Sequence, residues 1–270
     1  MDEKLELKQN PRRFNWIFWL ILLTGVYVWA LVGMNLSGLQ QLAGEVVKSM
    51  LTGLFHPDWA YVYNGSGEDL VSLIIQTLAI AFLGTFVSAI LSVPFAFWAA
   101  RTGRDLQSKM HWRSKCGKFV LVLIRTFPEI VLAIMFIKAV GPGSFAGVLA
   151  VSIHSIGMLG KLFSESLEGM DRGADEAIIS AGGNKVETLC IATLPEILPQ
   201  FMSYTLYRFE IAVRSASILG MVGAGGIGTP LLFAIQTRSW DRVGIILLGI
   251  IVTVTLIDFV SGNLRKKLNG

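Results

Sequence analysis

The chain has 270 residues and a net charge of +4; 53% of its residues are hydrophobic and 16% are charged, and its mean hydropathy is +0.60. A soluble domain carries about 25% charged residues, so this composition excludes a disordered chain, a coiled coil and an ordinary cytosolic enzyme. The positive charge is too small and too scattered to indicate nucleic-acid binding. Cys116 and Cys190 form no spaced motif, which supports neither a disulfide framework nor a metal site.

Six apolar stretches come close to the length of about 20 residues that a helix needs to cross a bilayer. In chain order, the predicted spans cover residues 15–34, 70–100, 119–140, 144–162, 199–222 and 243–262. The apolar core of the first stretch is too long for a cleaved signal peptide, so we expect a retained helix. Pro94 and Pro128 are expected to kink or weaken their helices. The prediction is an all-α, polytopic membrane protein with six transmembrane helices in a lipid bilayer.

The placement of lysine and arginine predicts the orientation, because cytoplasmic loops carry an excess of these residues. Basic residues gather in the N-terminal tail, in the loop at 101–118 and in the C-terminal tail, and six crossings put all three clusters, and both termini, in the cytoplasm. The predicted organisation is a cytoplasmic tail at 1–14, the first span and an external loop at 15–69, the transmembrane domain at 70–262 and a second cytoplasmic tail at 263–270.

The external loop has a pattern of its own. Apolar residues from Leu39 to Leu54 recur at helical spacing and predict a short amphipathic helix on the outer surface. Trp59, Tyr61 and Tyr63, which follow it, suit an aromatic belt at the membrane interface. We expect these segments to form a packed cap outside the cell.

A polar stretch at 163–195, between the fourth and fifth predicted spans, has an acidic bias that departs from the basic cytoplasmic loops. Asp175 and Glu176 suit the first turn of a short helix, where the helix dipole favours negative charge. Gly182 and Asn184 offer left-handed conformations that end this helix, and Pro195 is expected to restart the chain into the fifth span. The pattern predicts a helix, a tight turn and a second helix that bind a protein partner on the cytoplasmic face.

This stretch resembles the EAA loop of bacterial ABC-importer permeases. The residues in register with the motif are Glu176, Ala177, Gly182, Leu194 and Pro195. Two positions depart from it, since Ile178 stands for the second alanine and Ala192 for an isoleucine. The resemblance implies a type I ABC-importer permease fold, like that of methionine-importer permeases. It also implies that a coupling loop at 163–199 docks on an ATP-binding subunit.

Further segments look like the phosphonate ABC-transporter permeases. They are Arg-Thr-Phe-Pro-Glu at 125–129, Ile-His-Ser-Ile-Gly-Met-Leu-Gly-Lys at 153–161, Tyr-Thr-Leu-Tyr-Arg-Phe-Glu at 204–210 and the glycine run at 220–228. The resemblance implies a permease of the bacterial inner membrane for phosphonates or a related oxyanion such as phosphite. It implies three kinds of partner: a cytoplasmic ATPase dimer, an extracytoplasmic binding protein and a second copy of the permease. A permease for methionine or phosphate and an ATP-independent secondary transporter remain as alternatives.

No P-loop occurs in the sequence, so we expect the partner ATPase, and not this chain, to bind ATP and magnesium. Gly223, Gly225, Gly226 and Gly228 spell the dinucleotide fingerprint, but they end a span instead of following a strand. We expect no cofactor in this chain. The glycines are expected to break the helix near its outer end and to form an outer gate where the path narrows.

Charged and titratable residues inside the predicted spans are candidates for function, because each is costly in hydrocarbon. They are Arg125, Glu129, His154, Arg208, Glu210 and Arg214. Arg125 and Glu129 are four residues apart, as are the last two, so each pair is expected to share a helix face. Arg208 has no obvious local partner. Two interpretations remain open. These residues line the path of an oxyanion, which prefers a guanidinium group, or they form ion pairs that fix helix packing, with Arg125 extending to the cytoplasmic surface.

Overall fold

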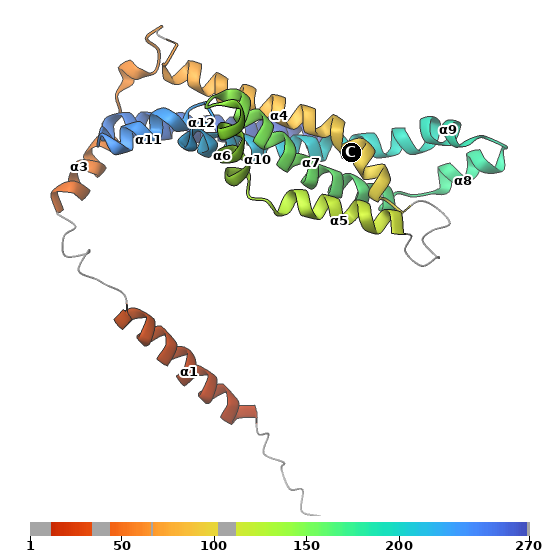
Figure 1. Ribbon diagram of the computed structural model, residues 1–270, viewed down its shortest axis with the longest axis horizontal. Helices are drawn as coiled ribbons and strands as arrows, with labels where there is room; N and C mark the ends of the chain where they lie inside the picture. The colour runs from red at the N-terminus through yellow and green to blue at the C-terminus, as the bar shows by residue number, and fades with distance from the viewer. Residues whose placement is uncertain (1–11, 34–43, 66, 102–111, 269–270) are drawn as a thin grey trace, which may run out of the picture. The chain divides into compact units, whose positions relative to one another are not determined.

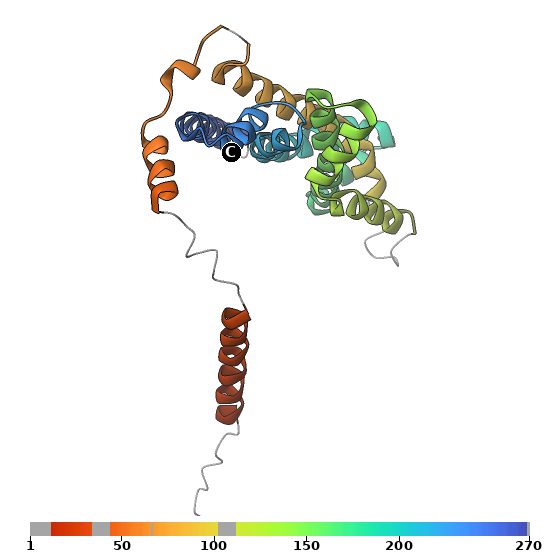
Figure 2. The ribbon, with the colours of Figure 1, turned by 60° about the vertical axis from the view of Figure 1, so that its left-hand side comes forward.

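The computed structural model describes residues 12–33, 44–65, 67–101 and 112–268, and every regular element in these ranges is a helix (Figures 1 and 2). The chain divides into two compact units, Met1–Ser49 and Met50–Gly270. The all-α prediction is therefore confirmed.

The N-terminal unit contains α1 (Arg12–Gly33) and the start of α3 (Gly44–Phe55). The segment Trp16–Gly33 is apolar on all sides and none of its residues is buried in the protein. A helix that is apolar all round requires lipid or another protein around it, so α1 agrees with the predicted first span. The amphipathic helix of the external loop is confirmed in α3, and its predicted beginning at 39–43 lies outside the described residues.

The second unit is a bundle of long helices with short ones at its ends. The long helices are α4 (Leu70–Ala99), α5 (Trp112–Thr126), α6 (Glu129–Val140), α7 (Ser144–Gly169), α10 (Leu194–Leu219) and α12 (Trp240–Leu268). The short ones are η1 (Trp59–Tyr61), α8 (Gly173–Ser180), α9 (Lys185–Thr188), the π-helical turn η3 (Leu189–Thr193), η4 (Gly220–Val222) and α11 (Gly228–Gln236). α7 packs against α4, α5, α6 and α10 and is the centre of the unit.

Small residues allow this close packing. A Cβ atom added at Gly160 of α7 would lie 2.6 Å from a methyl carbon of Leu121 on α5, so these two helices approach at a distance that only glycine permits. Near the ends of α7 and α10, the rings of Phe163 and Phe201 stack with their centroids 4.0 Å apart. This stack belongs to an apolar cluster that joins α4, α7 and α10, so the three helices are tightly packed where the cytoplasmic loop is predicted to begin.

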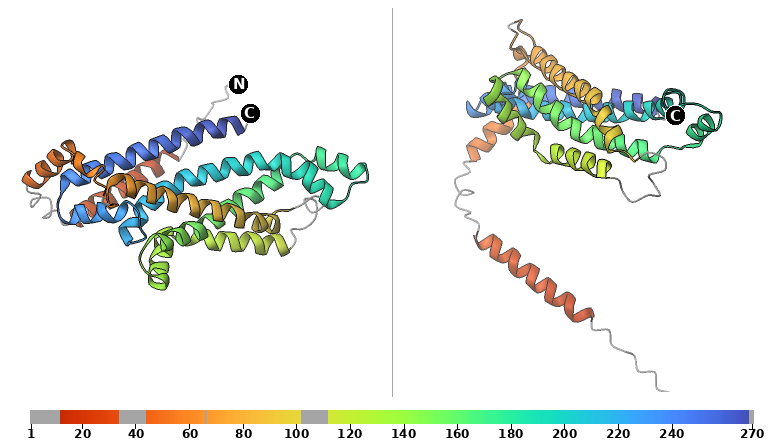
Figure 3. Two further views of the ribbon diagram at one scale, coloured as in Figure 1. Left: turned by 90° about the horizontal axis from the view of Figure 1, so that it is seen from above. Right: turned by 45° about the vertical axis from the view of Figure 1, so that its right-hand side comes forward.

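Four described helices are long and apolar enough to cross a membrane, and the count becomes five if α5 and α6 are one broken span. The single helix predicted at 119–140 is wrong, because the chain bends by 79° between α5 and α6 (Figure 3). Pro128 lies at this break, immediately before α6, so its expected effect of weakening the helix is confirmed. Pro94, by contrast, lies inside the unbroken α4. α10 is as long as α7 but carries three charged residues in its C-terminal half.

The helices of the second unit alternate in direction. α4, α7 and α12 run one way and α5 and α10 run the other, so the α8–α9 hairpin lies at the end where α4 and α12 finish (Figure 3). η1 and α11 lie at the opposite end (Figure 1). There, the Asp58 N–H donates to the carbonyl of Asp241, 3.2 Å away, which joins the loop before α4 to the start of α12. This arrangement agrees with a predicted cytoplasmic hairpin and an external aromatic segment.

Candidate functional site

The predicted cytoplasmic hairpin begins with α8. Asp175 and Glu176 lie in its first turn, as predicted, and Ala177 follows them. The Gly173 N–H donates to Asp171 Oδ1 at 3.1 Å and fixes the entry into the helix. No residue of α8 is buried and most are exposed, so most of the helix surface is available to a partner.

The turn after α8 requires glycine. Gly182 has φ of +90°, which confirms the predicted left-handed turn and which side chains other than glycine rarely adopt. The Gly183 N–H donates to the Ile178 carbonyl at 2.9 Å, and a Cβ atom at Gly183 would lie 2.5 Å from the Ile178 side chain. The two glycines therefore end α8 and turn the chain back.

The second helix of the hairpin begins at Asn184 and not at Pro195. Asn184 Oδ1 accepts from the N–H groups of Val186 and Glu187 at 2.9 and 3.0 Å, and Glu187 Oε2 accepts from the Asn184 N–H at 2.7 Å. This is a capping box, and its Asn-x-x-Glu signal was visible in the sequence. Helical structure runs without a break from Lys185 into α10, so the expected interruption before Pro195 is absent, but the predicted position of this proline in the first turn of α10 is confirmed.

Pro195 has a different effect. Since proline has no N–H and its ring crowds the carbonyl four residues earlier, it disturbs the helix just before it. The turn there is π-helical, and the Leu194 N–H bonds to the carbonyl of Leu189, five residues back. Such single π turns occur frequently at functional sites.

Two hydrogen bonds hold the hairpin to the bundle. Thr193 Oγ1 donates to Asp175 Oδ1 at 2.9 Å, which joins the π turn to α8. The Asp171 N–H donates to Glu196 Oε1 at 2.9 Å, which joins the end of α7 to the start of α10. The hairpin is therefore fixed to both helices that lead into it.

The hairpin exposes apolar side chains beside its acidic ones. Ile179, Val186 and Ile191 are 60%, 67% and 66% exposed. Exposed apolar residues rimmed by polar ones mark protein interaction sites. The hairpin has the character of a docking surface.

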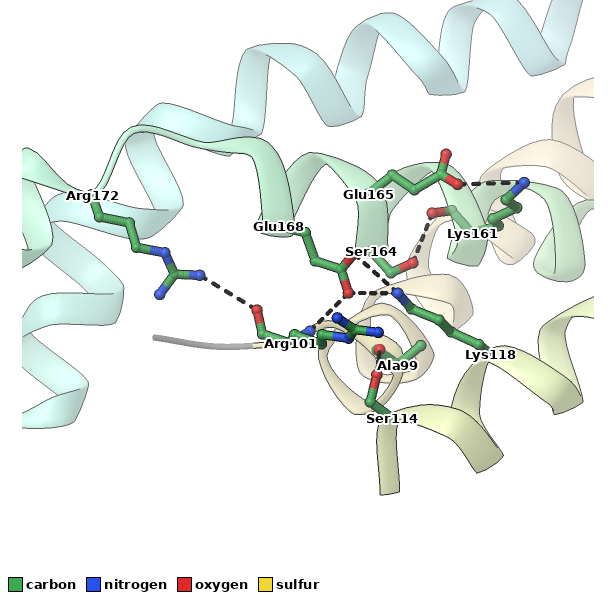
Figure 4. A network of polar contacts seen from close by, with 9 residues as sticks. All are labelled: Ala99, Arg101, Ser114, Lys118, Lys161, Ser164, Glu165, Glu168 and Arg172. Atoms are coloured by element: carbon green, nitrogen blue, oxygen red, sulfur yellow. Dashed lines mark hydrogen bonds and ion pairs between the residues drawn. The ribbon is translucent and has the colours of Figure 1, made fainter. Parts of the chain in front are cut away.

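Beneath the hairpin, Glu168 joins three helices (Figure 4). Its carboxylate lies 2.7 Å from Lys118 Nζ of α5 and accepts from the Arg101 N–H, just after α4, at 2.9 Å. Arg172 donates to the Arg101 carbonyl at 3.4 Å, and Ser114 donates to the Ala99 carbonyl at 2.6 Å. Sequence reasoning did not identify this cluster, because its members are far apart along the chain.

Arg208 lies deepest of the charged residues in the spans, with 1% of its surface exposed. Its Nη2 lies 3.3 Å from both carboxylate oxygens of Glu129, and its Nε donates to Ser155 Oγ at 2.7 Å. The expected Arg125–Glu129 pair on one helix face is wrong, because the bend separates the two residues into different helices. His154 lies beside the bend, where its Nδ1 is 3.1 Å from the Phe127 carbonyl oxygen that the broken helix leaves free.

The expected pair of Glu210 and Arg214 is confirmed by a direct contact between the two side chains. Two residues of α12 extend it: Arg265 Nη2 lies 2.8 Å from Glu210 Oε2, and Asp258 Oδ1 lies 3.4 Å from Arg214. The four charges cancel, and they join α10 to α12. Arg265 belongs to a helix that continues to Leu268, although residues 263–270 are predicted to be a tail.

The glycine run forms a tight turn between α10 and α11. Gly223, Gly225 and Gly226 all have positive φ, and a Cβ atom at Gly228 would lie 2.3 Å from the Ser217 carbonyl oxygen. α4 supports this turn, since Gln76 Oε1 accepts from the Gly226 N–H at 3.2 Å and Thr77 Oγ1 accepts from the Ile227 N–H at 2.9 Å. The predicted helix break is confirmed, and the outer gate stays a prediction.

Residues 92–270 match the family described as the binding-protein-dependent transport system inner membrane component. The chain belongs to this family. It is therefore the permease component of a transport system and a multi-pass membrane protein, and the helical hairpin occupies the segment that resembles the EAA loop.

Three relatives are named for phosphorus oxyanions. The chain is 35% identical to the phosphite transport system permease protein of Stutzerimonas stutzeri over 93% of this chain and 86% of the relative. It is 37% identical to the phosphate-import permease protein of Mycolicibacterium smegmatis over 76% of this chain but only 38% of that relative. It is 47% identical to the putative cryptic phosphonate transport system permease protein of Escherichia coli K12 over 44% of this chain and 98% of that relative.

The fold is that of a type I ABC-importer permease. A chain of the MetNI methionine ABC transporter, solved in inward facing conformations, superposes with a TM-score of 0.64 at 18% identity, over 76% of this chain and 99% of that chain. At this identity the likeness concerns the fold alone.

Proposed function

We propose that the chain is the membrane-spanning permease subunit of an ATP-driven importer for reduced-phosphorus oxyanions, phosphonates or phosphite. The observation that carries this proposal is the similarity to permeases named for phosphite and phosphonate transport. The α8–α9 hairpin, with its exposed apolar side chains, supplies the surface on which an ATPase subunit would dock.

The hairpin couples ATP hydrolysis to movement of the spans. A cytoplasmic ATPase dimer, which binds ATP and Mg²⁺, docks on the exposed faces of α8 and α9. The Asp175–Thr193 and Asp171–Glu196 bonds make the hairpin rigid, and the Glu168 cluster connects it to α4 and α5. Closure of the ATPase pair then moves α4, α5, α7 and α10 as packed helices.

Two further partners complete the assembly. An extracytoplasmic binding protein delivers the oxyanion to the end of the bundle that carries η1, α11 and the glycine turn. A second copy of the chain encloses the path, because a single copy leaves the charged side chains of Arg214 on α10 and Asp258 on α12 nearly half exposed within the predicted spans. Both termini lie in the cytoplasm.

The test is co-purification followed by transport. The tagged chain is isolated from its host membrane, and its partners are identified by mass spectrometry. The complex is then reconstituted in liposomes, and uptake of phosphite, methylphosphonate and phosphate is measured with and without ATP. We expect an ATPase and a binding protein to accompany the chain, and uptake to require both ATP and the binding protein.

Phosphate is the second candidate substrate, because one relative is named a phosphate-import permease. Phosphate uptake that exceeds uptake of phosphite and methylphosphonate would favour it. Uptake by the chain alone, driven by an ion gradient, would instead identify a secondary transporter and would contradict the proposed function.

A further inference from the structure

The break between α5 and α6 lies beside the middle of α7. A Cβ atom at Gly157 would lie 2.7 Å from the backbone nitrogen of Arg125, so these two residues are in contact at the same depth. Gly157 lies halfway along the 26 residues of α7, which places it about 20 Å from either end at a rise of about 1.5 Å per residue. Arg125 therefore lies level with the middle of α7, inside the segment 119–140 that is predicted to span the membrane.

The chain around the break is exposed. Arg125, Thr126, Phe127 and Pro128 are all exposed in the monomer, and the last two residues are outside any helix. Lipid cannot satisfy the backbone groups of a broken helix or solvate a guanidinium group, so such segments at membrane depth occur only against protein or beside a water-filled cavity. Lipid around this surface would leave these backbone groups and this charge unsatisfied.

Arg125 differs from the other two arginines in the spans. Arg208 pairs with Glu129 and Arg214 pairs with Glu210, so a carboxylate already neutralises each of them. No carboxylate among the described residues forms an ion pair with Arg125. Arg125 lies in the last turn of α5, where the dipole of the helix C-terminus stabilises its positive charge. The dipole does not neutralise the guanidinium group, so the group remains available to bind an anion.

We propose that Arg125 lines the translocation path and contacts the oxyanion as it passes the α5–α6 break. A guanidinium group presents two parallel N–H groups, which match two oxygens of a tetrahedral phosphorus oxyanion. Arg208 and Arg214 act as structural ion pairs beside this path. The identity of the anion rests on the proposed function, whereas the exposure of Arg125 at the α5–α6 break does not.

Transport gives the first test. Uptake of phosphite and methylphosphonate is measured for the complete transporter that carries Arg125→Ala, Arg125→Lys or Arg113→Ala. Arg113 is an exposed arginine at the other end of α5 and serves as the matched control. At equal membrane abundance we expect Arg125→Ala to lower the uptake rate by about tenfold or more, Arg125→Lys to lower it less, and the control to transport normally. A wild-type uptake rate in Arg125→Ala would overturn the inference.

Accessibility gives a second test that does not depend on the substrate. In a background with Cys116→Ser and Cys190→Ser, Arg125→Cys and Leu123→Cys are treated with a negatively charged, membrane-impermeant methanethiosulfonate reagent. Leu123 lies on the other face of α5 and is the control. We expect the reagent to modify Arg125→Cys during ATP turnover, more slowly when phosphite is present, and to leave Leu123→Cys unmodified.

The two tests separate the two proposals. If the wild-type complex moves neither phosphite nor methylphosphonate, the proposed substrate is wrong, and the labelling of Arg125→Cys still decides whether the residue lines the path. If the wild type transports them but Arg125→Cys resists the reagent from both sides of the membrane, the inference is wrong and the proposed function stands.

Discussion

At the scale of single residues, the buried Arg208–Glu129 pair makes a clear prediction about stability. Removal of one partner of a buried ion pair leaves an uncompensated charge and costs about 3–5 kcal/mol. We therefore expect Arg208→Ala to lower the membrane abundance and the melting temperature of the detergent-purified protein. The Ser155 hydroxyl also loses its partner in this variant.

The double variant Arg208→Met with Glu129→Leu tests the same pair, because apolar residues of similar size avoid the buried charge. We expect it to recover abundance. A melting temperature of Arg208→Ala equal to that of the wild type would contradict a structural role for the pair.

Gly182 makes a prediction about coupling. Valine at φ of +90° introduces strain of about 1–3 kcal/mol, which is small for a packed bundle but large for a docking surface. Gly182→Val, and less severely Glu176→Lys, should leave abundance normal and lower both ATPase association and uptake. Gly262→Val is the matched control, since Gly262 lies outside the coupling loop and has open space around its Cα and no positive φ. If Gly182→Val is expressed at the wild-type level and its uptake rate is unchanged, the proposed role of the hairpin in coupling is wrong.

At the scale of elements, the Glu168 cluster joins α4, α5 and α7 beneath the hairpin (Figure 4). The Lys118–Glu168 pair is partly exposed, so its loss costs about 1 kcal/mol or less. We expect Glu168→Ala to reduce uptake more than it reduces the melting temperature, because α7 then moves without carrying α4 and α5. The charge-swapped variant Lys118→Glu with Glu168→Lys should recover part of the uptake; equal uptake in Glu168→Ala and the wild type would speak against this connection.

At the scale of the whole molecule, the alternating helix directions make a prediction about topology. In a background without Cys116 and Cys190, cysteines placed at Asn64 and Asn184 should react with an impermeant reagent from opposite sides of the membrane. Asn64 follows η1 and Asn184 begins α9, at the two ends of the bundle. Labelling of both positions from outside intact cells would contradict the six-span orientation.

The sequence by itself determined the features that depend on neighbouring residues. Apolar runs placed most of the spans, because about 20 apolar residues are needed to cross a bilayer whatever surrounds them. Asp175, Glu176 and Gly182 predicted α8 and its turn, since the helix dipole and positive φ act within a few residues. Even the capping box at Asn184 was present as a local pattern that sequence reasoning overlooked.

Only the tertiary structure decided which charges meet. Glu129 and Arg208 are 79 residues apart and Glu210 and Arg265 are 55 apart, so spacing along one helix gave the wrong partner for Glu129 and none for Arg208. The size of the bend at Pro128 was equally out of reach, because proline weakens a helix but the packing of α6 against α7 sets its direction. These contacts depend on where separate helices come together, and no local pattern contains that information.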